Sequence, residues 1–189
     1  PRAARELFAQ GERIVGIVAP ALVASYGELG PRLLGWLRRL GVAAFFDVSF
    51  GAELTVASYL DHVDRNAPRA LIAQPCPAIV TYVEVYRPEL LPHLAPADSP
   101  MLHTVKMIRE FHPEFAGHKV MVVSPCAAKR REFDETGLGD WNVTVKSLDR
   151  ELTARGVDLA REAPEAFVNP PAERGVVFST PGGLLRTAL

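Results

Sequence analysis

Two cysteines, Cys76 and Cys126, are the residues of this 189-residue chain whose type and setting best fit chemistry. Each follows an apolar run and a proline, and each precedes small residues that can open a helix, in segments 70–78 and 120–128. In parallel α/β sheets a ligand binds where a strand ends, because unpaired N–H groups of the next helix point outward there. Such a helix start also favours the thiolate, the form that binds metal or attacks electrophiles. The matched pair indicates one site shared by two similar halves.

The composition is that of an ordinary soluble protein, with 48% hydrophobic residues, 23% charged residues and a formal net charge of -1. This balance indicates neither nucleic acid nor an anionic membrane as a partner, and no apolar run has the length of a membrane span. Two cysteines do not make a secreted disulfide framework, so a cytoplasmic, reducing location is expected. The chain begins at Pro1 without a signal-peptide pattern, and we expect it to be part of a longer polypeptide.

Strands and helices alternate along the first half of the chain. The continuous apolar run 13–19 is typical of a buried parallel strand. Leu33, Leu34, Leu37 and Leu40 share one face of a helix. Right-handed crossovers through such helices generate a parallel sheet. The predicted elements are, in order, a strand over 13–19, a helix over 31–40, a strand over 44–48, a helix over 52–63 and a strand over 70–73.

A proline-rich segment, 86–100, separates this half from the next and cannot be regular helix or inner strand throughout. Ser99 and Pro100 suit the cap and first position of a helix over 101–111. We therefore predict an α/β protein of two lobes, 1–95 and 96–189, with mainly parallel sheets flanked by helices and the second lobe incomplete at its C-terminus. The second lobe is predicted to hold strands over 119–123, 142–145 and 176–178, a helix over 148–155 between Ser147 and Gly156, a loop over 164–173, and a helix after Gly182 and Gly183.

The sequence around both cysteines resembles the C-terminal domain of the large subunit of iron-only ([FeFe]) hydrogenases. The strongest stretch is 74–84 with the Pro-Glu-Leu-Leu of 88–91, which is similar to the family's first Cys-Pro motif and the residues after it. Segment 124–130 is similar to the family's Met-Pro-Cys-x-x-Lys-Lys. Weaker matches follow the same order along the chain, at 19–21, 50–55, 99–101 and 175–184.

The resemblance implies an iron–sulfur site between two α/β lobes. In this family four cysteines hold a [4Fe–4S] cluster, and one of them bridges to a two-iron subcluster that completes the H-cluster; thiolates suit iron because they are soft, charge-donating ligands. Cys76 and Cys126 match the first two cluster ligands, whereas the other two belong to a motif expected beyond Leu189. A complete cluster is thus expected in the full-length protein, and none or an incomplete one in this fragment. The other residues implied are Lys129 and Pro75 at catalytic positions and Pro20, Ser124, Pro100, Met101 and Phe178 around the cofactor.

Three departures from the family pattern concern catalysis. The family's proton-relaying cysteine is replaced by Pro75, which has no side-chain proton to give. Ser124 stands at the methionine before the second Pro-Cys, and Ser58 and Tyr59 replace an acidic pair on the proton path. A relay needs titratable groups within hydrogen-bond reach, so these replacements predict slow or absent hydrogen turnover. Lys129 matches the family's lysine that hydrogen-bonds a cyanide ligand of the two-iron subcluster, so the resemblance implies that the anion-binding side of the pocket is retained.

Simpler interpretations remain open for each feature. A free cysteine is often a buried core residue, and Lys129 alone would be a solvated surface lysine. Gly182 and Gly183 suit a tight turn as well as a ligand contact. The five histidines show no ligand spacing.

Three functions are therefore compared. The first is a hydrogenase-like iron–sulfur oxidoreductase domain, sensory or weakly active, with electron-transfer or signalling domains in the same longer chain. The second is a non-catalytic hydrogenase-like protein for iron–sulfur binding or assembly. The third is a cluster-free interaction module. The sequence leaves the oligomeric state open.

Overall fold

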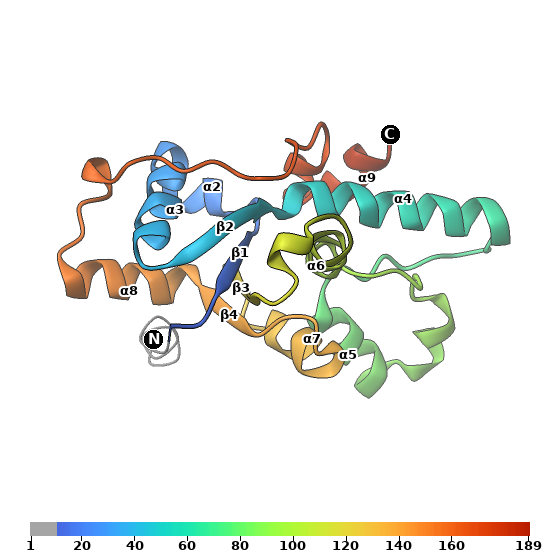
Figure 1. Ribbon diagram of the computed structural model, residues 1–189. Helices are drawn as coiled ribbons and strands as arrows, with labels where there is room; N and C mark the ends of the chain where they lie inside the picture. Colours follow the sequence, from blue (N-terminus) through green and yellow to red (C-terminus); the bar gives the residue numbers. More distant parts are fainter. Residues whose placement is uncertain (1–10) are drawn as a thin grey trace.

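A single parallel sheet forms the centre of the computed structural model, which describes residues 11–189 (Figure 1). Its four strands are ordered β2-β1-β3-β4, so β1 and β3 lie inside and β2 and β4 at the edges. All three pairings are parallel, and each strand therefore ends at the same edge of the sheet. The strands are β1 (Ile14–Val18), β2 (Val42–Asp47), β3 (Lys119–Ser124) and β4 (Trp141–Thr144).

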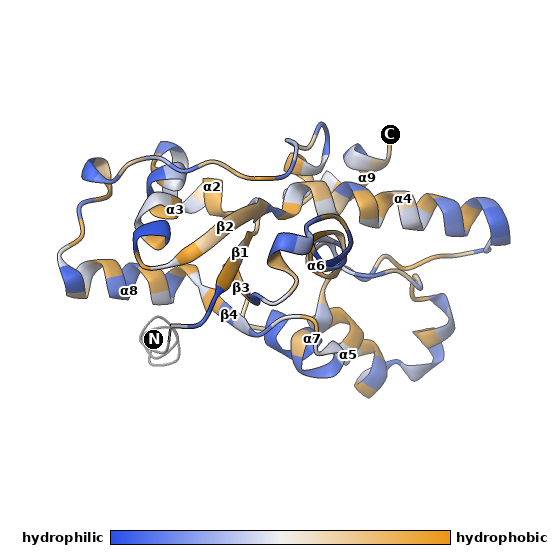
Figure 2. Ribbon diagram, viewed as in Figure 1, coloured by the Kyte–Doolittle hydropathy of each residue, from blue (hydrophilic) through white to orange (hydrophobic). Residues whose placement is uncertain are grey.

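Helices cover both faces of this sheet, as parallel strands require. One face packs against α3 (Gly30–Arg39) and α8 (Val145–Arg155), with Leu37 and Leu148 in a core that includes Ile14 and Val18. The other face packs against α6 (Pro100–Phe111) and α7 (Lys129–Thr136), with Val105 and Phe133 beside inward-facing residues of the same strands. Figure 2 shows the strands as the apolar centre of the molecule. The helices are α2 (Leu22–Tyr26), α3 (Gly30–Arg39), α4 (Val48–Asn66), α5 (Pro77–Tyr86), α6 (Pro100–Phe111), α7 (Lys129–Thr136), α8 (Val145–Arg155) and α9 (Gly183–Ala188).

Local capping explains where several helices begin and end. The Asp47 carboxylate accepts from the Ser49 N–H and starts α4 directly after β2. The Ser99 hydroxyl accepts from the Leu102 N–H at the start of α6, which confirms the predicted cap. Helix α8 begins earlier than predicted, because the hydroxyl of Thr144, rather than that of Ser147, is the cap. Gly156 ends α8 in the left-handed conformation, as predicted.

After α8 the chain runs back along the top of the view in Figure 1 to α9. Its segment 164–173 is a loop, as predicted, and it borders β2, where the Val168 N–H donates to the Phe45 carbonyl. The Asn169 side chain bonds to both backbone groups of Asp47: its oxygen accepts from the Asp47 N–H, and its nitrogen donates to the Asp47 carbonyl. Beyond this loop α9 lies against α4 (Figure 1). The loop thus fixes the end of β2, where the chain turns into α4.

The α/β class, the parallel strands and the flanking helices are confirmed. The strands expected for two lobes pair within one sheet, because β1 bonds to β3 as well as to β2. Two predicted strands are wrong: 70–73 contributes only an isolated bridge between Ile72 and Leu94, and 176–178 falls on a 3₁₀ turn, Gly175–Val177. The lobe boundaries 1–95 and 96–189 stay a prediction. The start at Pro1 lies outside the described residues, and no helix among residues 11–189 is long and apolar enough to cross a membrane.

Candidate iron–sulfur site

The second Pro-Cys turn follows β3 and is held by polar side chains. The Ser124 hydroxyl accepts from the Cys126 N–H at 3.3 Å and lies 3.2 Å from the Cys126 carbonyl oxygen. The Asn142 amide of β4 donates to the same carbonyl at 2.7 Å, and its oxygen lies 3.1 Å from the Ser124 hydroxyl. The Cys126 side chain is partly exposed and free. This network fixes the backbone at Cys126, so its thiol is presented from a positioned turn.

The first Pro-Cys turn is built differently, because no sheet strand leads into it. Cys76 is the cap residue of α5, with an extended backbone and a partly exposed, free thiol. Before it, the Gln74 amide donates to the carbonyls of Ala95 and Ala97, at 2.9 and 2.7 Å. Pro77 occupies the first turn of α5, as the sequence suggests. Side-chain anchoring of Gln74 therefore takes the place of the strand predicted over 70–73.

Lys129 joins the two turns. Its Nζ donates to the Pro75 carbonyl at 2.9 Å, one residue before Cys76, and pairs with Glu132 at 3.2 Å. The Lys129 residue is only 8% exposed, so it is not the solvated surface lysine of the simpler interpretation. Nearby, Arg131 of α7 bonds to Thr81 and pairs with Glu84 of α5, the latter at 2.7 Å. Helices α5 and α7 lie side by side as a result (Figure 1).

The positions of the family's acidic pair carry neutral hydroxyls. Ser58 donates to the Leu54 carbonyl and lies 3.3 Å from His103 Nε2. Burial raises the pKa of Tyr59 to about 12, although the nearby Gln74 backbone opposes the rise. The Tyr59 hydroxyl is buried and has no hydrogen-bond partner among the described residues. Neither side chain is a carboxyl group that could exchange a proton near neutral pH.

The remaining predicted site residues occupy different parts of the molecule. Pro20 follows β1 and lines an apolar cavity of about 670 Å³ with Asp47, Ser49 and Val176, at the carboxyl ends of β1 and β2. Pro100 and Met101 are buried in the first turn of α6, and Phe178 is half-buried after a 3₁₀ turn. The contacts described above bring together Pro75, Cys76, Ser124, Cys126 and Lys129. One cleft shared by all of the predicted residues stays a prediction.

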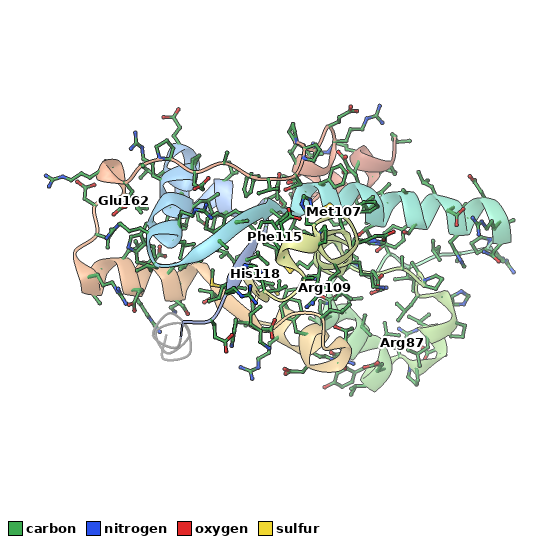
Figure 3. All side chains as sticks on the ribbon, viewed as in Figure 1. Arg87, Met107, Arg109, Phe115, His118 and Glu162 are labelled. Atoms are coloured by element: carbon green, nitrogen blue, oxygen red, sulfur yellow. The ribbon has the colours of Figure 1, made fainter. Side chains whose placement is uncertain are left out.

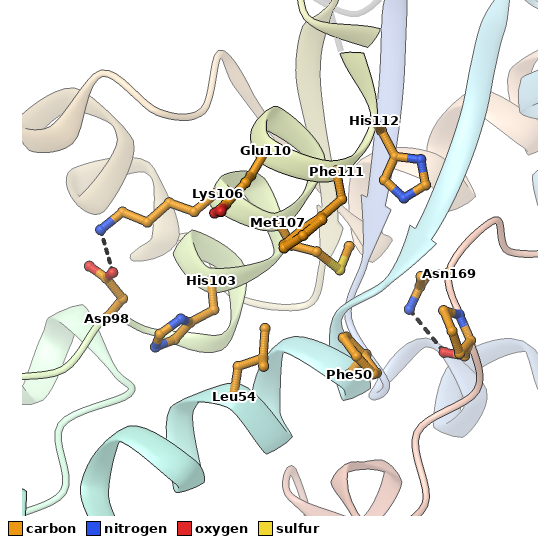
Figure 4. A pocket seen from close by; sticks show the side chains of 11 residues that line it. Phe50, Leu54, Asp98, His103, Lys106, Met107, Glu110, Phe111, His112 and Asn169 are labelled. Carbon is orange, nitrogen blue, oxygen red and sulfur yellow. Dashed lines mark hydrogen bonds and ion pairs between the residues drawn. The ribbon is translucent and has the colours of Figure 1, made fainter. Parts of the chain in front are cut away.

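A second cavity, about 530 Å³, lies between α4 and α6 (Figure 4). Its apolar wall includes Phe50, Leu54 and Met107, and at its rim Lys106 forms an ion pair with Asp98. Burial lowers the pKa of His103, with nearby Lys106 adding to the effect and Asp98 opposing it. His103 therefore prefers the neutral form in the folded protein.

This preference predicts a pH dependence of stability. The unfolded chain takes up a proton near the ordinary pKa of 6.5, whereas the folded chain resists protonation at His103 until a lower pH. The contribution of His103 to the free energy of unfolding should fall as the pH drops below about 6.5 and level off below the folded pKa. Urea unfolding between pH 7.5 and pH 4.5 measures this (roughly the range over which histidine titrates). His103→Gln should flatten that fall, and an unchanged slope would contradict the prediction.

The two cysteines of this sequence do not by themselves make a complete iron–sulfur site. A [4Fe–4S] cluster takes four thiolates, and the sequence contains two cysteines. Within residues 11–189 no group of three or more His, Cys, Asp or Glu residues is arranged to hold a metal ion. The ammonium group of Lys129 donates hydrogen bonds to the Pro75 carbonyl and the Glu132 carboxylate. Cys76 and Cys126 therefore fit two of the four ligand positions of such a cluster.

The fold and the two cysteine turns define an α/β domain with a candidate thiolate site. A family model described as "Iron only hydrogenase large subunit, C-terminal domain" matches residues 12–189. The chain therefore belongs to this family of iron-only hydrogenase domains, which confirms the predicted resemblance.

Curated relatives are longer than this chain. Iron hydrogenase 1 of Clostridium pasteurianum is 28% identical over 216 residues, a match that covers 100% of this chain and 38% of the relative. The periplasmic [Fe] hydrogenase large subunit of Nitratidesulfovibrio vulgaris is 25% identical, with 84% and 42% covered. The nuclear prelamin A recognition factor of Rattus norvegicus is 26% identical, with 69% and 32% covered.

Solved structures support the fold. The chain superposes on an [FeFe]-hydrogenase solved in a study of stepwise H-cluster assembly with a TM-score of 0.79 and 23% identity, covering 98% of this chain and 55% of that one. An apo [FeFe]-hydrogenase from Chlamydomonas reinhardtii gives a TM-score of 0.79 at 22% identity, with 98% and 56% covered. At this identity the likeness establishes the fold alone.

Proposed function

We propose that this chain is the iron–sulfur-binding part of a hydrogenase-like protein, in which Cys76 and Cys126 are cluster ligands. The observation that carries the proposal is the hydrogen bond from Lys129 Nζ to the Pro75 carbonyl, which ties the turn after β3 to the turn that starts α5. Two free, partly exposed cysteines lie close in sequence to the two partners of this bond, Cys76 directly after Pro75 and Cys126 three residues before Lys129, which supports the proposal. The remaining thiolates of a [4Fe–4S] cluster come from outside this set of residues.

The role is sensory or weakly active rather than that of a fast hydrogenase. Pro75 offers no proton at the position of the family's relay cysteine. The buried Tyr59 hydroxyl, with its pKa raised to about 12, is too weak an acid to replace a carboxyl group. The same features favour a second candidate, a non-catalytic protein for iron–sulfur binding or assembly. Both candidates place the chain in a reducing compartment such as the cytoplasm, beside electron-transfer or signalling domains of a longer chain.

The proposal is tested by anaerobic reconstitution of the full-length protein with iron and sulfide, followed by iron analysis and visible absorption after desalting. We expect Cys76→Ser and Cys126→Ser each to lose most of the bound iron, because serine is a poor ligand for iron–sulfur clusters. Circular dichroism serves as the control, since neither substitution should change the secondary structure. Iron retained at the wild-type level by the double variant would overturn the ligand assignment and favour the cluster-free interaction module.

A further inference from the structure

The cavity between α4 and α6 has the size and the apolar walls of a small-molecule pocket. Its volume of about 530 Å³ is typical of such pockets. Phe50 and Leu54 form its wall on α4. Met107, which Figure 3 labels, and Phe111 form the opposite wall on α6 (Figure 4). Two aromatic rings, an aliphatic side chain and an adaptable thioether favour a ligand with an apolar, aromatic body.

One end of this cavity offers a neutral hydrogen-bond acceptor. The Ser58 hydroxyl donates its proton to the Leu54 carbonyl at 3.0 Å, so its oxygen accepts from His103 Nε2, which lies 3.3 Å away. The proton of the neutral imidazole is therefore on Nε2, and Nδ1 is an acceptor. Within residues 11–189 no hydrogen bond is formed by His103 Nδ1. Burial lowers the pKa of His103, which keeps the ring in this neutral form.

The other end carries an unpaired negative charge. Glu110 of α6 lines the cavity and forms no ion pair or hydrogen bond with the other described residues. Two further polar groups of the lining are already satisfied, because Lys106 pairs with Asp98 and the Asn169 amide bonds to the Asp47 backbone. The free polar groups of the lining are thus a carboxylate and an imidazole nitrogen, which are both acceptors. A ligand that matches them brings donors, one of them positively charged.

The two acceptors are too far apart to bind one ammonium group. His103 and Glu110 are seven residues apart on α6, so about 10 Å of helix separates them. Met107 and its apolar surroundings lie between them. His112, at the end of the same wall, has its Nδ1 3.2 Å from the Glu114 carboxylate and is already partnered. The arrangement therefore fits an apolar body with one donor at each end.

We propose that the α4–α6 cavity binds a small aromatic amine, whose ring lies between Phe50 and Met107 and whose ammonium group pairs with Glu110. A neutral O–H or N–H group at the far end of the ring donates to His103 Nδ1. Binding is reversible and involves no covalent step. No residue of the two Pro-Cys turns lines this cavity, so the inference goes beyond the proposed function and does not depend on a bound cluster.

Tyramine is the probe that tests the site, because it carries a phenol hydroxyl and an ammonium group at opposite ends of one ring. Titration of the full-length protein, followed by saturation-transfer NMR, measures its Kd. We expect a Kd of about 1 mM, the scale expected of a ligand this small. 3-(4-Hydroxyphenyl)propionate, with a carboxylate in place of the amine, should bind at least about tenfold more weakly. 2-Phenylethylamine, which lacks the hydroxyl, should bind about fivefold more weakly.

Three variants assign the two ends of the ligand. Glu110→Gln should weaken tyramine binding about fivefold, the upper range for an exposed ion pair. His103→Leu should remove the preference for tyramine over 2-phenylethylamine, because it removes the acceptor for the hydroxyl. Asp64→Asn is the matched control, since Asp64 is an exposed carboxylate of α4 outside the cavity lining, and its affinity for tyramine should be unchanged. Thermal melts check that each variant is folded.

Each contrary outcome has a definite meaning. The absence of saturable tyramine binding, or equal binding of 3-(4-hydroxyphenyl)propionate, overturns this inference. An equal loss of affinity in Asp64→Asn and Glu110→Gln does so as well, because the attraction would then be a general effect of surface charge. Tyramine binding that persists in a protein unable to bind iron overturns only the proposed function.

Discussion

Replacing Lys129 with methionine is expected to lower the free energy of unfolding by about 3 kcal/mol, because it breaks a buried ion pair by removing one partner. The Lys129 and Glu132 side chains are 10% and 12% exposed, so the remaining carboxylate would have little water to compensate it. The Pro75 carbonyl would lose its hydrogen bond at the same time. Equilibrium unfolding in guanidinium chloride, followed by circular dichroism, measures the change.

Two further variants make this expectation specific. Lys106→Met removes a lysine that pairs with Asp98 at the surface, and its cost should stay below about 1 kcal/mol. Glu132→Gln in the Lys129→Met background should recover part of the loss, because a neutral amide costs less to bury than an unpaired charge. Equal costs for Lys129→Met and Lys106→Met would show that the Lys129 bridge between the Pro-Cys turns contributes little to stability.

A second large effect is expected at Gly51, where α4 crosses α6. A Cβ atom there would overlap the Pro100 carbonyl oxygen and Thr104 Oγ1, so the two helices approach too closely for any side chain. Gly51→Ala must push α6 away from α4 and should cost about 3 kcal/mol, at the upper end of ordinary overpacking. The melting temperature and the guanidinium midpoint both measure it.

Gly117 provides the control for this substitution. It lies in an exposed turn outside the left-handed region, and a Cβ atom there would meet only the end of the Arg13 side chain, at an ordinary contact distance of 3.5 Å. Gly117→Ala should therefore be neutral or slightly stabilising, because alanine lowers the entropy of the unfolded chain. A Gly51→Ala protein as stable as Gly117→Ala would contradict the close helix crossing.

Patterns confined to neighbouring residues predict most elements of the fold. The apolar run around Ile14–Val18, the Ser99 cap and the Gly156 stop each reflect a local preference, and each is found. The failures are short apolar runs whose state depends on distant partners. Segment 70–73 forms an isolated bridge between Ile72 and Leu94, and 176–178 falls on a 3₁₀ turn, so neither joins the sheet. Pairing of β1 with β3 is equally non-local, which is why the two expected sheets are one.

In the candidate site, too, features set by neighbouring residues could be predicted, and features set by contacts between distant elements could not. Motifs around the two cysteines and Lys129 make them visible in the sequence, whereas Asn142 is not, because its contact with the Cys126 carbonyl joins the end of β3 to β4. Glu132 carries a usable signal, since it lies three residues after Lys129 on a helix and can reach back to it. The buried Tyr59 hydroxyl has none, because burial of a particular atom follows from packing between elements.

The central place of β1 has a consequence for how the protein is made. Strand β1 receives hydrogen bonds from β2 on one edge and from β3 on the other, yet β3 begins at Lys119. During synthesis β1 and β2 can pair early, but the second edge of β1 stays unsatisfied until about a hundred more residues have been added. An apolar strand with an open edge is a site for mispairing with other nascent chains. Production of this protein should therefore benefit from slow expression at low temperature, which limits the concentration of half-finished chains.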